Sequence, residues 1–340
     1  MSNVILTHAC NKGCSYCFAR ETRDSHVTVG ACADDVHMSM EMFSSILDKH
    51  VANLPPGRAG QVKLLGGEPT QHPKFDEILA LCYERNIEVT LISNFLFSKE
   101  KRDIILKYLE ARPMHFLINS TELDQKNRME IFKENYNEIY KFLYARNAED
   151  NMSCGLTLDQ DVGIEYYINY IDYLKDNLIA IEHMRVSLSF PGDTDKKNQF
   201  FFINNTKLGD SLVFITKKLL DANIPANLDC INFPCMYESK EESKFVKKFL
   251  AGSDKYICGT GPGPTDYMPD GTAIYCYPNA NTVVDATRLK SDTAVQESLR
   301  MKYQIARATL VLPDACQECN ARKAGQCDGP CLGFFSYDKI

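Results

Sequence analysis

The sequence predicts an α/β fold built on parallel strands, and two observations indicate it. Between residue 1 and about residue 225, six short apolar runs of strand length alternate with six longer amphipathic stretches of helix length. Repeats of strand and helix imply parallel strands with right-handed crossovers, which suits a barrel or an open doubly wound sheet. Glycine-, asparagine- or cysteine-bearing segments follow several of these strands, and catalytic loops gather at that end of such sheets.

The elements follow one another regularly along this part of the chain. The predicted strands lie at 3–7, 61–65, 88–92, 115–119, 153–158 and 184–190. The predicted helices lie near 39–54, 73–86, 99–111, 125–146, 162–176 and 208–223. The clearest helical face, with apolar residues at i, i+3, i+4 and i+7, is formed by Phe75, Ile78, Leu79 and Cys82. Pro73 fits the first turn of that helix.

The amino-acid composition and the helical periodicity change after residue 225, so we predict two domains, at 1–225 and 226–340. Glycine and proline become frequent, as in the run from Gly259 to Pro264, and one helical piece is expected at 294–308. A segment so rich in loops has little apolar core of its own, and metal binding would supply the missing folding energy.

Composition limits the class of protein. The chain has 340 residues, 44% hydrophobic and 24% charged, with a net charge of −7. Lys and Arg are dispersed, which disfavours a nucleic-acid groove. No signal peptide and no apolar run of membrane-spanning length is visible, so we expect a cytoplasmic protein that binds neither nucleic acid nor membrane.

The cysteines point to metal chemistry. Of 14 cysteines, three lie within residues 10–17 and eight lie after residue 229, leaving Cys32, Cys82 and Cys154. In a reducing cytosol such thiols are more often metal ligands or catalytic groups than disulfides. Cys82 and Cys154 fall on apolar faces, so we predict core positions for both.

The first group is Cys10, Cys14 and Cys17, directly after the first predicted strand, with the aromatic Tyr16 before the last cysteine. Thiolates are the usual ligands of iron–sulfur clusters, and three on one loop leave one iron of a cubane open. This spacing resembles the signature of the radical S-adenosylmethionine (SAM) superfamily. The alternative is part of a structural zinc site, but zinc ligands usually come as paired Cys-x-x-Cys units.

The resemblance implies a partial (β/α)6 TIM-type barrel, a SAM-binding 4Fe–4S cluster on the three cysteines, and SAM as a cofactor. Leu65 precedes the segment Gly66-Gly67-Glu68-Pro69, which matches the family's contact to the methionine amino group. The family further implies cofactor-binding roles for Tyr16, Ser93, Asn94, Asn119 and Ser120. Taken alone, the Ser-Asn and Asn-Ser pairs read as turns or helix caps.

The family's chemistry follows from that site. The open iron chelates SAM, an electron from the cluster splits the sulfonium, and the 5′-deoxyadenosyl radical takes a hydrogen atom from the substrate. A donor such as flavodoxin or ferredoxin would supply the electron. The barrel positions the reactants and excludes water.

The second group resembles the SPASM/twitch extension, a small Cys-rich C-terminal domain with auxiliary 4Fe–4S clusters. Its predicted metal ligands are Cys230, Cys235, Cys258, Cys276, Cys316, Cys319, Cys327 and Cys331. A hairpin turn at Pro269–Thr272 would return Cys276 toward Cys258.

The ligand partition stays open. In the full SPASM pattern, Cys258, Cys276 and Cys331 share a cluster with an upstream cysteine, and Cys316, Cys319 and Cys327 hold a second whose fourth ligand is undefined. In the twitch pattern, a single cluster uses Cys258, Cys276, Cys316 and Cys319. We favour two clusters. A zinc ribbon from Cys316, Cys319, Cys327 and Cys331 is the non-redox alternative.

Two enzyme functions compete at this stage. The family favours peptide modification, an oxidoreductase of the peptide-maturation type, over a small-molecule dehydrogenase or rearrangement enzyme. Because the cluster loop starts at residue 10, we expect a peptide to come on a separate carrier protein or by direct docking. A thiol of Cys230 or Cys235 that is not a ligand could return a hydrogen atom to the substrate. A non-catalytic zinc-binding interaction module is the remaining alternative.

Overall fold

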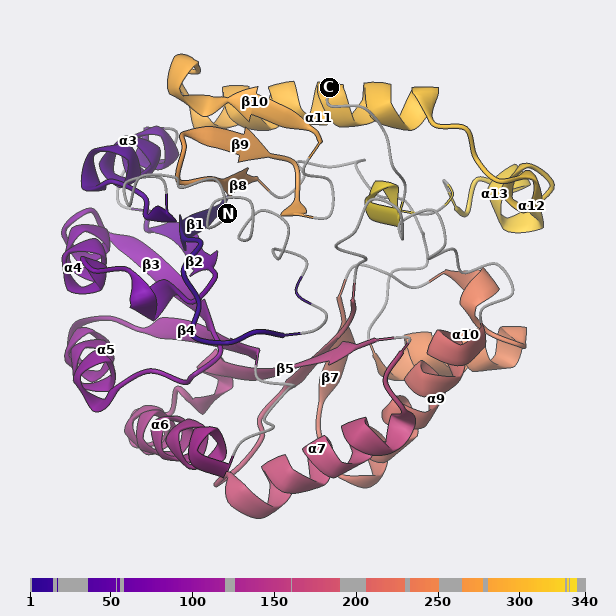
Figure 1. The fold of residues 1–340 in the computed structure, drawn as a ribbon, viewed down its shortest axis with the longest axis horizontal. Coiled ribbons are helices and arrows are strands. Elements are labelled where there is room, and N and C mark those ends of the chain that lie inside the picture. The colour runs from indigo at the N-terminus through magenta and orange to yellow at the C-terminus, as the bar shows by residue number, and fades with distance from the viewer. Residues whose placement is uncertain are drawn as a thin grey trace.

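The computed structural model describes residues 2–14, 17, 36–52, 54–55, 58–119, 126–159, 161–189, 206–229, 233–250, 265–277, 281–327, 329 and 331–334. Six parallel strands, neighbours in chain order, form its centre (Figure 1): β1 (Ser2–Thr7), β2 (Gly60–Gly66), β3 (Ile87–Ser93), β4 (Met114–Asn119), β5 (Met152–Leu158) and β6 (Met184–Leu188). Each of these strands is followed by a helix, in order α3 (Met40–Val51), α4 (Phe75–Glu84), α5 (Lys99–Ala111), α6 (Lys126–Tyr144), α7 (Ile164–Asn177) and α9 (Thr206–Asp221). The six predicted strands and six predicted helices are confirmed, and the fold is a partial TIM-type barrel.

The start of α4 differs from the expectation. The helix begins at Phe75 with Lys74 as its N-cap, so Pro73 lies ahead of the first turn. The reason is a short 3-10 turn η1 (Pro69–Gln71) followed by His72, whose Nδ1 accepts the Lys74 N–H at 3.1 Å. The predicted apolar face is buried as expected, at Phe75, Ile78, Leu79 and Cys82.

The sheet continues beyond the six strands on both sides. β7 (Ala226–Leu228) pairs in parallel with β6, and β8 (Asp266–Tyr267) pairs in parallel with β1. β9 (Thr272–Ile274) and β10 (Val283–Asp285) then add antiparallel to give a ten-stranded sheet. Gly271, with φ of 82°, forms the predicted hairpin turn between β8 and β9.

The remaining elements after β7 are helices and 3-10 turns: η3 (Pro234–Met236), α10 (Lys240–Phe249), η5 (Ala286–Arg288), α11 (Asp292–Thr309), α12 (Asp314–Gln317), α13 (Asn320–Lys323) and η6 (Leu332–Phe334). A further 3-10 turn, η2 (Glu149–Asn151), precedes β5. The helical piece expected at 294–308 is α11. Figure 1 shows α11 lying along the β8–β10 hairpin, at the edge of the molecule opposite α7.

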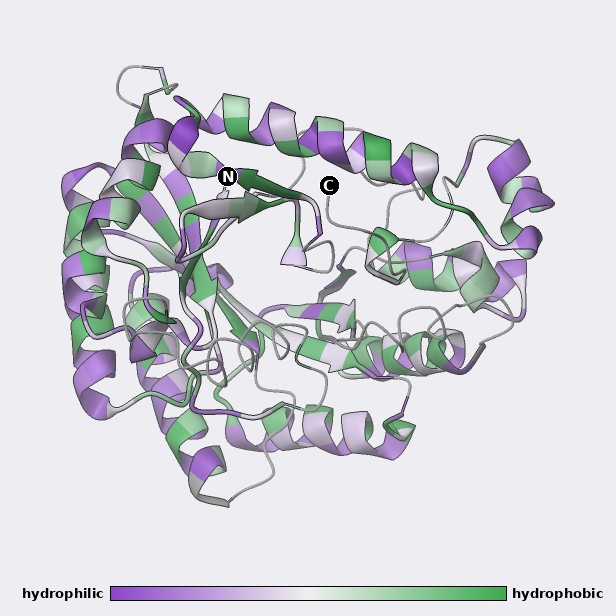
Figure 2. Cartoon of the chain, turned by 45° about the horizontal axis from the view of Figure 1, so that its top comes forward, coloured by the Kyte–Doolittle hydropathy of each residue, from purple (hydrophilic) through white to green (hydrophobic). Residues whose placement is uncertain are grey.

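One main apolar cluster fills the protein and includes residues from the barrel strands, the barrel helices and α11. Val295, Leu299 and Tyr303 of α11 are almost fully buried in it. The C-terminal region therefore shares the barrel's core instead of building its own, and the boundary at 225/226 stays a prediction. The helices carry hydrophilic and hydrophobic residues in alternation, as their amphipathic patterns require (Figure 2).

Cys82 and Cys154 occupy core positions, as predicted, with 1% of each exposed. Among the described helices, none is both long and apolar enough to cross a bilayer.

Candidate active site

The predicted site residues lie where parallel strands end. Thr7, Gly66, Ser93 and Asn119 are the last residues of β1, β2, β3 and β4. Cys10, Cys14 and Cys17 follow β1 on one loop and are half-buried. Tyr16, Ser120, Cys230 and Cys258, which the sequence also singled out, lie outside the described residues.

Gly66 and Gly67 bring the end of β2 against the cysteine loop. The Gly67 N–H donates to the Thr7 carbonyl at 2.8 Å, and the Glu68 N–H donates to the Ala9 carbonyl at 2.8 Å. A Cβ at Gly67 would lie 2.2 Å from the Ala9 oxygen, and one at Gly66 would lie 2.3 Å from the Thr7 oxygen. Gly66 also has a φ of 145°, which favours glycine. Both positions therefore require glycine for this approach.

Glu68 is fully buried and ties β2 to β3. Its Oε1 accepts from the Thr70 hydroxyl at 2.8 Å and from the Ser93 hydroxyl at 2.9 Å. Its Oε2 accepts the Asn94 N–H at 2.8 Å. Burial raises the pKa of Glu68, and these hydrogen bonds oppose the rise. The observed contacts make Glu68 the residue that holds the two loops together; its contact with SAM stays a prediction.

A second connection joins the cysteine loop to the segment after β3. Asn94 Nδ2 donates to Asn11 Oδ1 at 2.8 Å and reaches Cys10 Sγ at 4.0 Å. Asn11 Nδ2 in turn donates to the Leu96 carbonyl at 2.7 Å. Sequence reasoning missed Asn11, although its place directly after Cys10 in the loop was a usable signal. Asn94 therefore organises the cysteine loop as well as the end of β3.

The charge around the three thiols suits a cationic group. Burial raises the pKa of Cys10 to about 11, the Lys12 N–H hydrogen bond lowers it, and negative charge on Glu68, Cys14 and Cys17 raises it further. Thiolates gathered beside a buried carboxylate are mutually repulsive until positive charge joins them. Iron supplies that charge in a cluster, so these residues fit the group that the sequence predicts.

Asn119 lies at the rim formed by β4 and β5. It pairs in register with Gly155, and a Cβ on Gly155 would lie 2.1 Å from Asn119 Oδ1. The Asn119 side chain therefore lies across the glycine backbone at the end of the strand pair. Its role in binding SAM stays a prediction.

The β8–β9 hairpin packs against the first cysteine group. Met268, Ile274 and Tyr277 form a small apolar cluster with Ile5, and Cys17 packs against it. Burial, followed by the charges of Asp266 and Cys17, raises the pKa of the Tyr277 hydroxyl. Tyr277 follows Cys276 directly in sequence, so one strand end connects the two predicted cysteine groups.

The described C-terminal cysteines lie at different depths. Cys316 and Cys327 are buried, Cys276, Cys319 and Cys331 are half-buried, and Cys235 is exposed. Burial, followed by the charges of Cys316 and Cys327, raises the pKa of the Cys235 thiol to about 12. Within the described residues, no three Cys, His, Asp or Glu side chains converge closely enough to hold a single metal ion. A zinc ribbon at Cys316–Cys331 therefore finds no support in this part of the structure.

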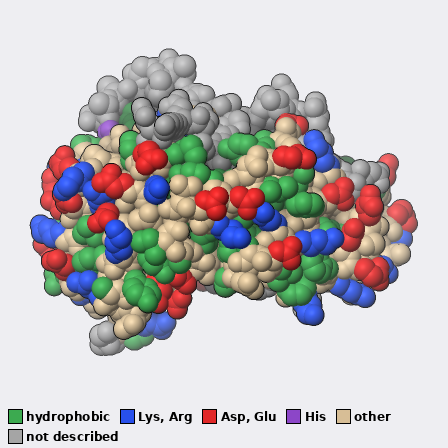
Figure 3. All heavy atoms as spheres, turned by 90° about the horizontal axis from the view of Figure 1, so that it is seen from below, with side chains coloured by type: hydrophobic (Ala, Val, Ile, Leu, Met, Phe, Trp, Pro, Cys, Tyr) green, Lys and Arg blue, Asp and Glu red, His purple; other side chains and the backbone are tan. Residues whose placement is uncertain are grey.

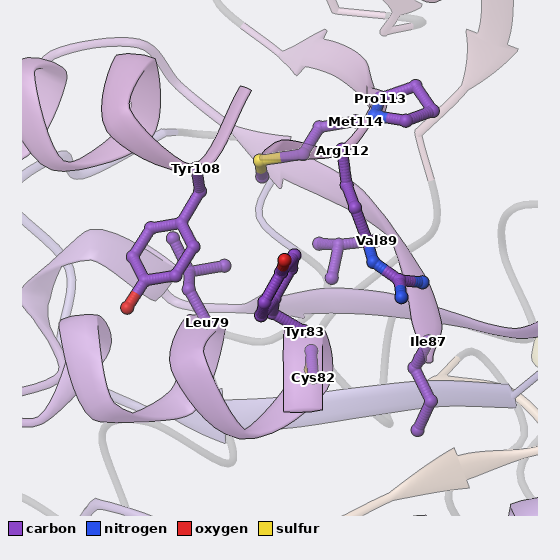
Figure 4. A pocket seen from close by; sticks show the side chains of 9 residues that line it. All are labelled: Leu79, Cys82, Tyr83, Ile87, Val89, Tyr108, Arg112, Pro113 and Met114. Carbon is purple, nitrogen blue, oxygen red and sulfur yellow. The ribbon is translucent and has the colours of Figure 1, made fainter. Parts of the chain in front are cut away.

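A small pocket lies at the other end of the strands. It is bounded by Ile87 and Met114, the first residues of β3 and β4, with Tyr83, Tyr108 and Arg112 at its rim (Figure 4). It is thus separated from the cysteine loop by the length of the sheet. On the face seen in Figure 3, acidic and basic side chains are interspersed.

Known proteins resemble this chain in part of its sequence and in its fold. Residues 4–152 match the sequence model of the Radical SAM superfamily, whereas no curated protein matches. The fold is similar to that of Streptococcus suis SuiB bound to S-adenosylmethionine, with a TM-score of 0.59 and 16% identity over 97% of this chain and 72% of that one. It is also similar to anSMEcpe with bound AdoMet, with a TM-score of 0.62 and 14% identity over 100% of this chain and 92% of that one.

The matched residues 4–152 contain the cysteine loop, the Gly66–Pro69 segment and the end of β3. The Cys-rich C-terminal region is consistent with the auxiliary-cluster extension expected from the sequence. Residues 4–152, a little under half of the chain, thus match the radical SAM superfamily, whose cofactors are a 4Fe–4S cluster and SAM.

Proposed function

We propose that this radical SAM protein is an oxidoreductase that matures a peptide by abstracting one of its hydrogen atoms. Bound at the cysteine loop, the cluster and SAM supply the 5′-deoxyadenosyl radical for that step. Cys10, Cys14 and Cys17 would hold three irons of the cluster. Gly66 to Pro69, with Ser93, Asn94 and Asn119, would line the SAM side of the site.

The observation that carries the proposal is the closure of the β2 loop onto the cysteine loop. Two glycines allow backbone contact at Thr7 and Ala9, and the buried Glu68 carboxylate ties the same loop to Ser93 and Asn94. The thiols and the backbone groups after β2 are thereby held rigidly at one rim. Rigid placement of reacting groups is the main contribution that a protein can make to a cofactor reaction.

The peptide substrate rests on two structural neighbours. SuiB was solved bound to the precursor peptide SuiA, with a TM-score of 0.56 to this chain, and anSMEcpe was solved with bound AdoMet and Cp18Cys peptide, with a TM-score of 0.58. The first alignment covers 97% of this chain and the second 100%. This similarity in fold supports a peptide as the substrate, because it includes the C-terminal region as well as the barrel.

The first test is SAM cleavage. Anaerobically reconstituted protein with dithionite and SAM should release 5′-deoxyadenosine, and Cys10→Ala, Cys14→Ala and Cys17→Ala should each abolish it. Cys82→Ala removes a thiol from the core, away from the loop, and should retain cleavage. If wild-type protein with a full cluster never produces 5′-deoxyadenosine or a covalent SAM product, the enzyme assignment is wrong.

The second test addresses the substrate. Synthetic peptides encoded by short open reading frames beside the gene are incubated with the enzyme, SAM and reductant. Peptides deuterated at candidate positions should transfer the label to 5′-deoxyadenosine, and their mass should change. Turnover of a sugar or nucleotide with no change in any peptide would contradict the peptide assignment and leave SAM cleavage intact.

A further inference from the structure

The chain returns to β1 after the first cysteine loop. Residues 36–38 lie just before α3 and run alongside the end of β1. The His8 N–H donates to the Val36 carbonyl at 2.8 Å, and the Met38 N–H donates to the Leu6 carbonyl at 2.8 Å. The two ends of the segment that carries the three thiols are therefore held side by side.

Between these two backbone hydrogen bonds, the side chains of Thr7 and His37 meet. Thr7 is fully buried, and its Oγ1 lies 2.8 Å from His37 Nδ1. The same Oγ1 accepts the Ala9 N–H at 2.9 Å. A buried hydroxyl proton requires an acceptor, and among the described residues His37 Nδ1 is the acceptor that this proton meets. The Thr7 hydroxyl therefore donates to His37 and accepts from Ala9.

The backbone of Ala9 is fixed from two directions. Its N–H is held by Thr7 of β1, and its carbonyl oxygen accepts the Glu68 N–H of the β2 loop at 2.8 Å. Cys10 follows directly, so the peptide bond that leads into the first thiol cannot rotate without breaking one of these bonds. A chain of hydrogen bonds thus runs from His37 through Thr7 to the residue before Cys10.

His72 holds the same returning segment from the β2 side. It is 2% exposed, and its Nδ1 accepts the Lys74 N–H at 3.1 Å. Its Nε2 therefore carries the proton and donates to the Met38 carbonyl at 2.9 Å. The rings of His37 and His72 meet edge to face, with their centroids 5.3 Å apart. This packing restricts the His37 ring and keeps its Nδ1 directed at Thr7.

We propose that His37 is a positioning residue for the SAM-binding cluster, acting through the Thr7 hydroxyl on the peptide between Ala9 and Cys10. The inference deepens the proposed function and rests on it for the cluster itself. The effect of His37 reaches Cys10 through hydrogen bonds of the chain and not through contact with iron. A small displacement of a reacting group lowers the rate of a reaction more than it lowers binding. Loss of the His37 contact should therefore slow SAM cleavage while the cluster stays bound.

The first test is a double-mutant cycle on anaerobically reconstituted protein. Thr7→Val and His37→Leu should each keep the iron content of wild type and change the EPR spectrum of the reduced cluster with SAM. Each should slow release of 5′-deoxyadenosine by about tenfold, the effect of losing about one buried hydrogen bond. The double variant should be no slower than Thr7→Val, because both changes interrupt one chain of bonds.

A conservative variant separates the hydrogen bond from the bulk of the ring. His37→Asn places an amide oxygen near the position of Nδ1 and should restore the rate and the EPR spectrum. Multiplying rate losses in the double variant, a wild-type rate in His37→Leu, or no rescue by His37→Asn overturns the inference.

A second measurement needs no turnover. Hydrogen–deuterium exchange of the anaerobically purified protein, resolved to single residues by mass spectrometry, reads the Ala9 N–H directly. Exchange at Ala9 should be at least about tenfold faster in His37→Leu than in wild type. His115→Asn, at an exposed histidine of β4, is the matched control and should exchange like wild type.

The outcomes distinguish the two proposals. Equal exchange at Ala9 in wild type and His37→Leu overturns the inference and leaves 5′-deoxyadenosine release by wild type intact. Failure of the proposed function abolishes that release in wild type and leaves the difference in Ala9 exchange in place.

Discussion

At the level of single residues, glycines at the end of β2 set how closely two loops can approach. The carbonyl oxygens of Thr7 and Ala9 occupy the space where side chains at 66 and 67 would begin. Both oxygens already accept hydrogen bonds from the β2 loop, so they cannot move away without losing them. The geometry of the whole site therefore depends on the absence of two methyl groups.

We expect Gly67→Ala to abolish SAM cleavage, because its methyl group forces the Ala9 carbonyl and the cysteine loop outward. Overpacking of this kind costs about 1–3 kcal/mol locally. Gly13→Ala is the matched control: it lies in the same loop, and its Cβ would meet no atom within 4 Å. Release of 5′-deoxyadenosine measures both. Equal activity of the two variants would show that the close approach is unimportant.

Glu68 provides a second prediction at this scale. Glu68→Gln places an amide NH2 among the Thr70, Ser93 and Asn94 donors, which have no acceptor to replace the lost oxygen. Leaving such a buried donor unsatisfied costs about 1–3 kcal/mol. We expect a lower urea midpoint and weaker SAM binding by isothermal calorimetry.

The control for this variant is Glu88→Gln on β3, where the carboxylate accepts from Gln61 at an exposed site. It should be nearly neutral in both measurements. If Glu68→Gln binds SAM as tightly as wild type and is equally stable, Glu68 does not hold the loops together.

At the level of elements, the seam between β1 and β8 attaches the C-terminal hairpin to the barrel. Asn3 is paired in register with Asp266, and its Nδ2 donates to the Asp266 carboxylate at 2.5 Å. Burial raises the pKa of Asp266 from 3.8 to about 6, against the hydrogen bonds from Asn3 and the Tyr277 backbone and the charge of Lys63. The seam therefore contains a carboxyl group that the fold prefers in its neutral form.

This preference predicts a pH dependence with a definite sign. Since the folded pKa is the higher one, the stabilising contribution of Asp266 is fully present below pH 3.8 and is lost as the pH rises through about 6. The loss amounts to about 3 kcal/mol at about 1.4 kcal/mol for each pKa unit.

Asp266→Asn cannot ionise, so its stability relative to wild type should increase by about 2.4 kcal/mol between pH 4 and pH 7. Urea unfolding across that range, followed by circular dichroism, measures the difference. A difference that does not vary with pH would show that Asp266 keeps an ordinary pKa. The change with pH is diagnostic even if the amide alters stability by a constant amount.

The alternation of strands and helices could be predicted because it is local. Each barrel helix depends on a periodicity such as that of Phe75, Ile78 and Cys82, which neighbouring residues determine. The β1–β8 pairing could not be predicted, since it joins residues 263 positions apart through a two-residue strand. Nor does any local signal indicate Phe95, which adopts a φ of 60° directly after Asn94.

The residues of the candidate site also differ in how far the sequence alone can predict them. Cys10, Cys14 and Cys17 are recognisable because their spacing lies within one loop. The grouping of the C-terminal cysteines into sites is not, because it depends on how segments far apart in the sequence lie relative to one another. Spacing patterns indicate which residues bind metal, and only tertiary packing assigns them to sites.

At the level of the whole molecule, Asp292 connects the first strand of the barrel with the C-terminal region. It lies in the first turn of α11, where the helix dipole favours a negative charge. Its carboxylate accepts from the Ser2 hydroxyl at 3.0 Å, the Tyr267 hydroxyl at 2.7 Å and the Gln296 amide at 2.9 Å. His50 Nδ1 of α3 lies 3.4 Å away. One buried side chain therefore connects β1, β8, α3 and α11.

Asp292→Ala should lower the free energy of unfolding by about 3 kcal/mol, because it leaves buried donors on several elements unsatisfied. Glu297→Ala, an exposed position on the same helix, is the matched control and should change stability by less than about 0.5 kcal/mol. Urea unfolding of reconstituted protein measures both. β1 leads into the first cysteine loop and α11 into Cys316, so both cysteine groups depend on this connection. Asp292→Ala should therefore also lose iron from both sites faster under a chelator. Iron retention equal to that of Glu297→Ala, together with equal stability, would show that α11 is held by its apolar face alone.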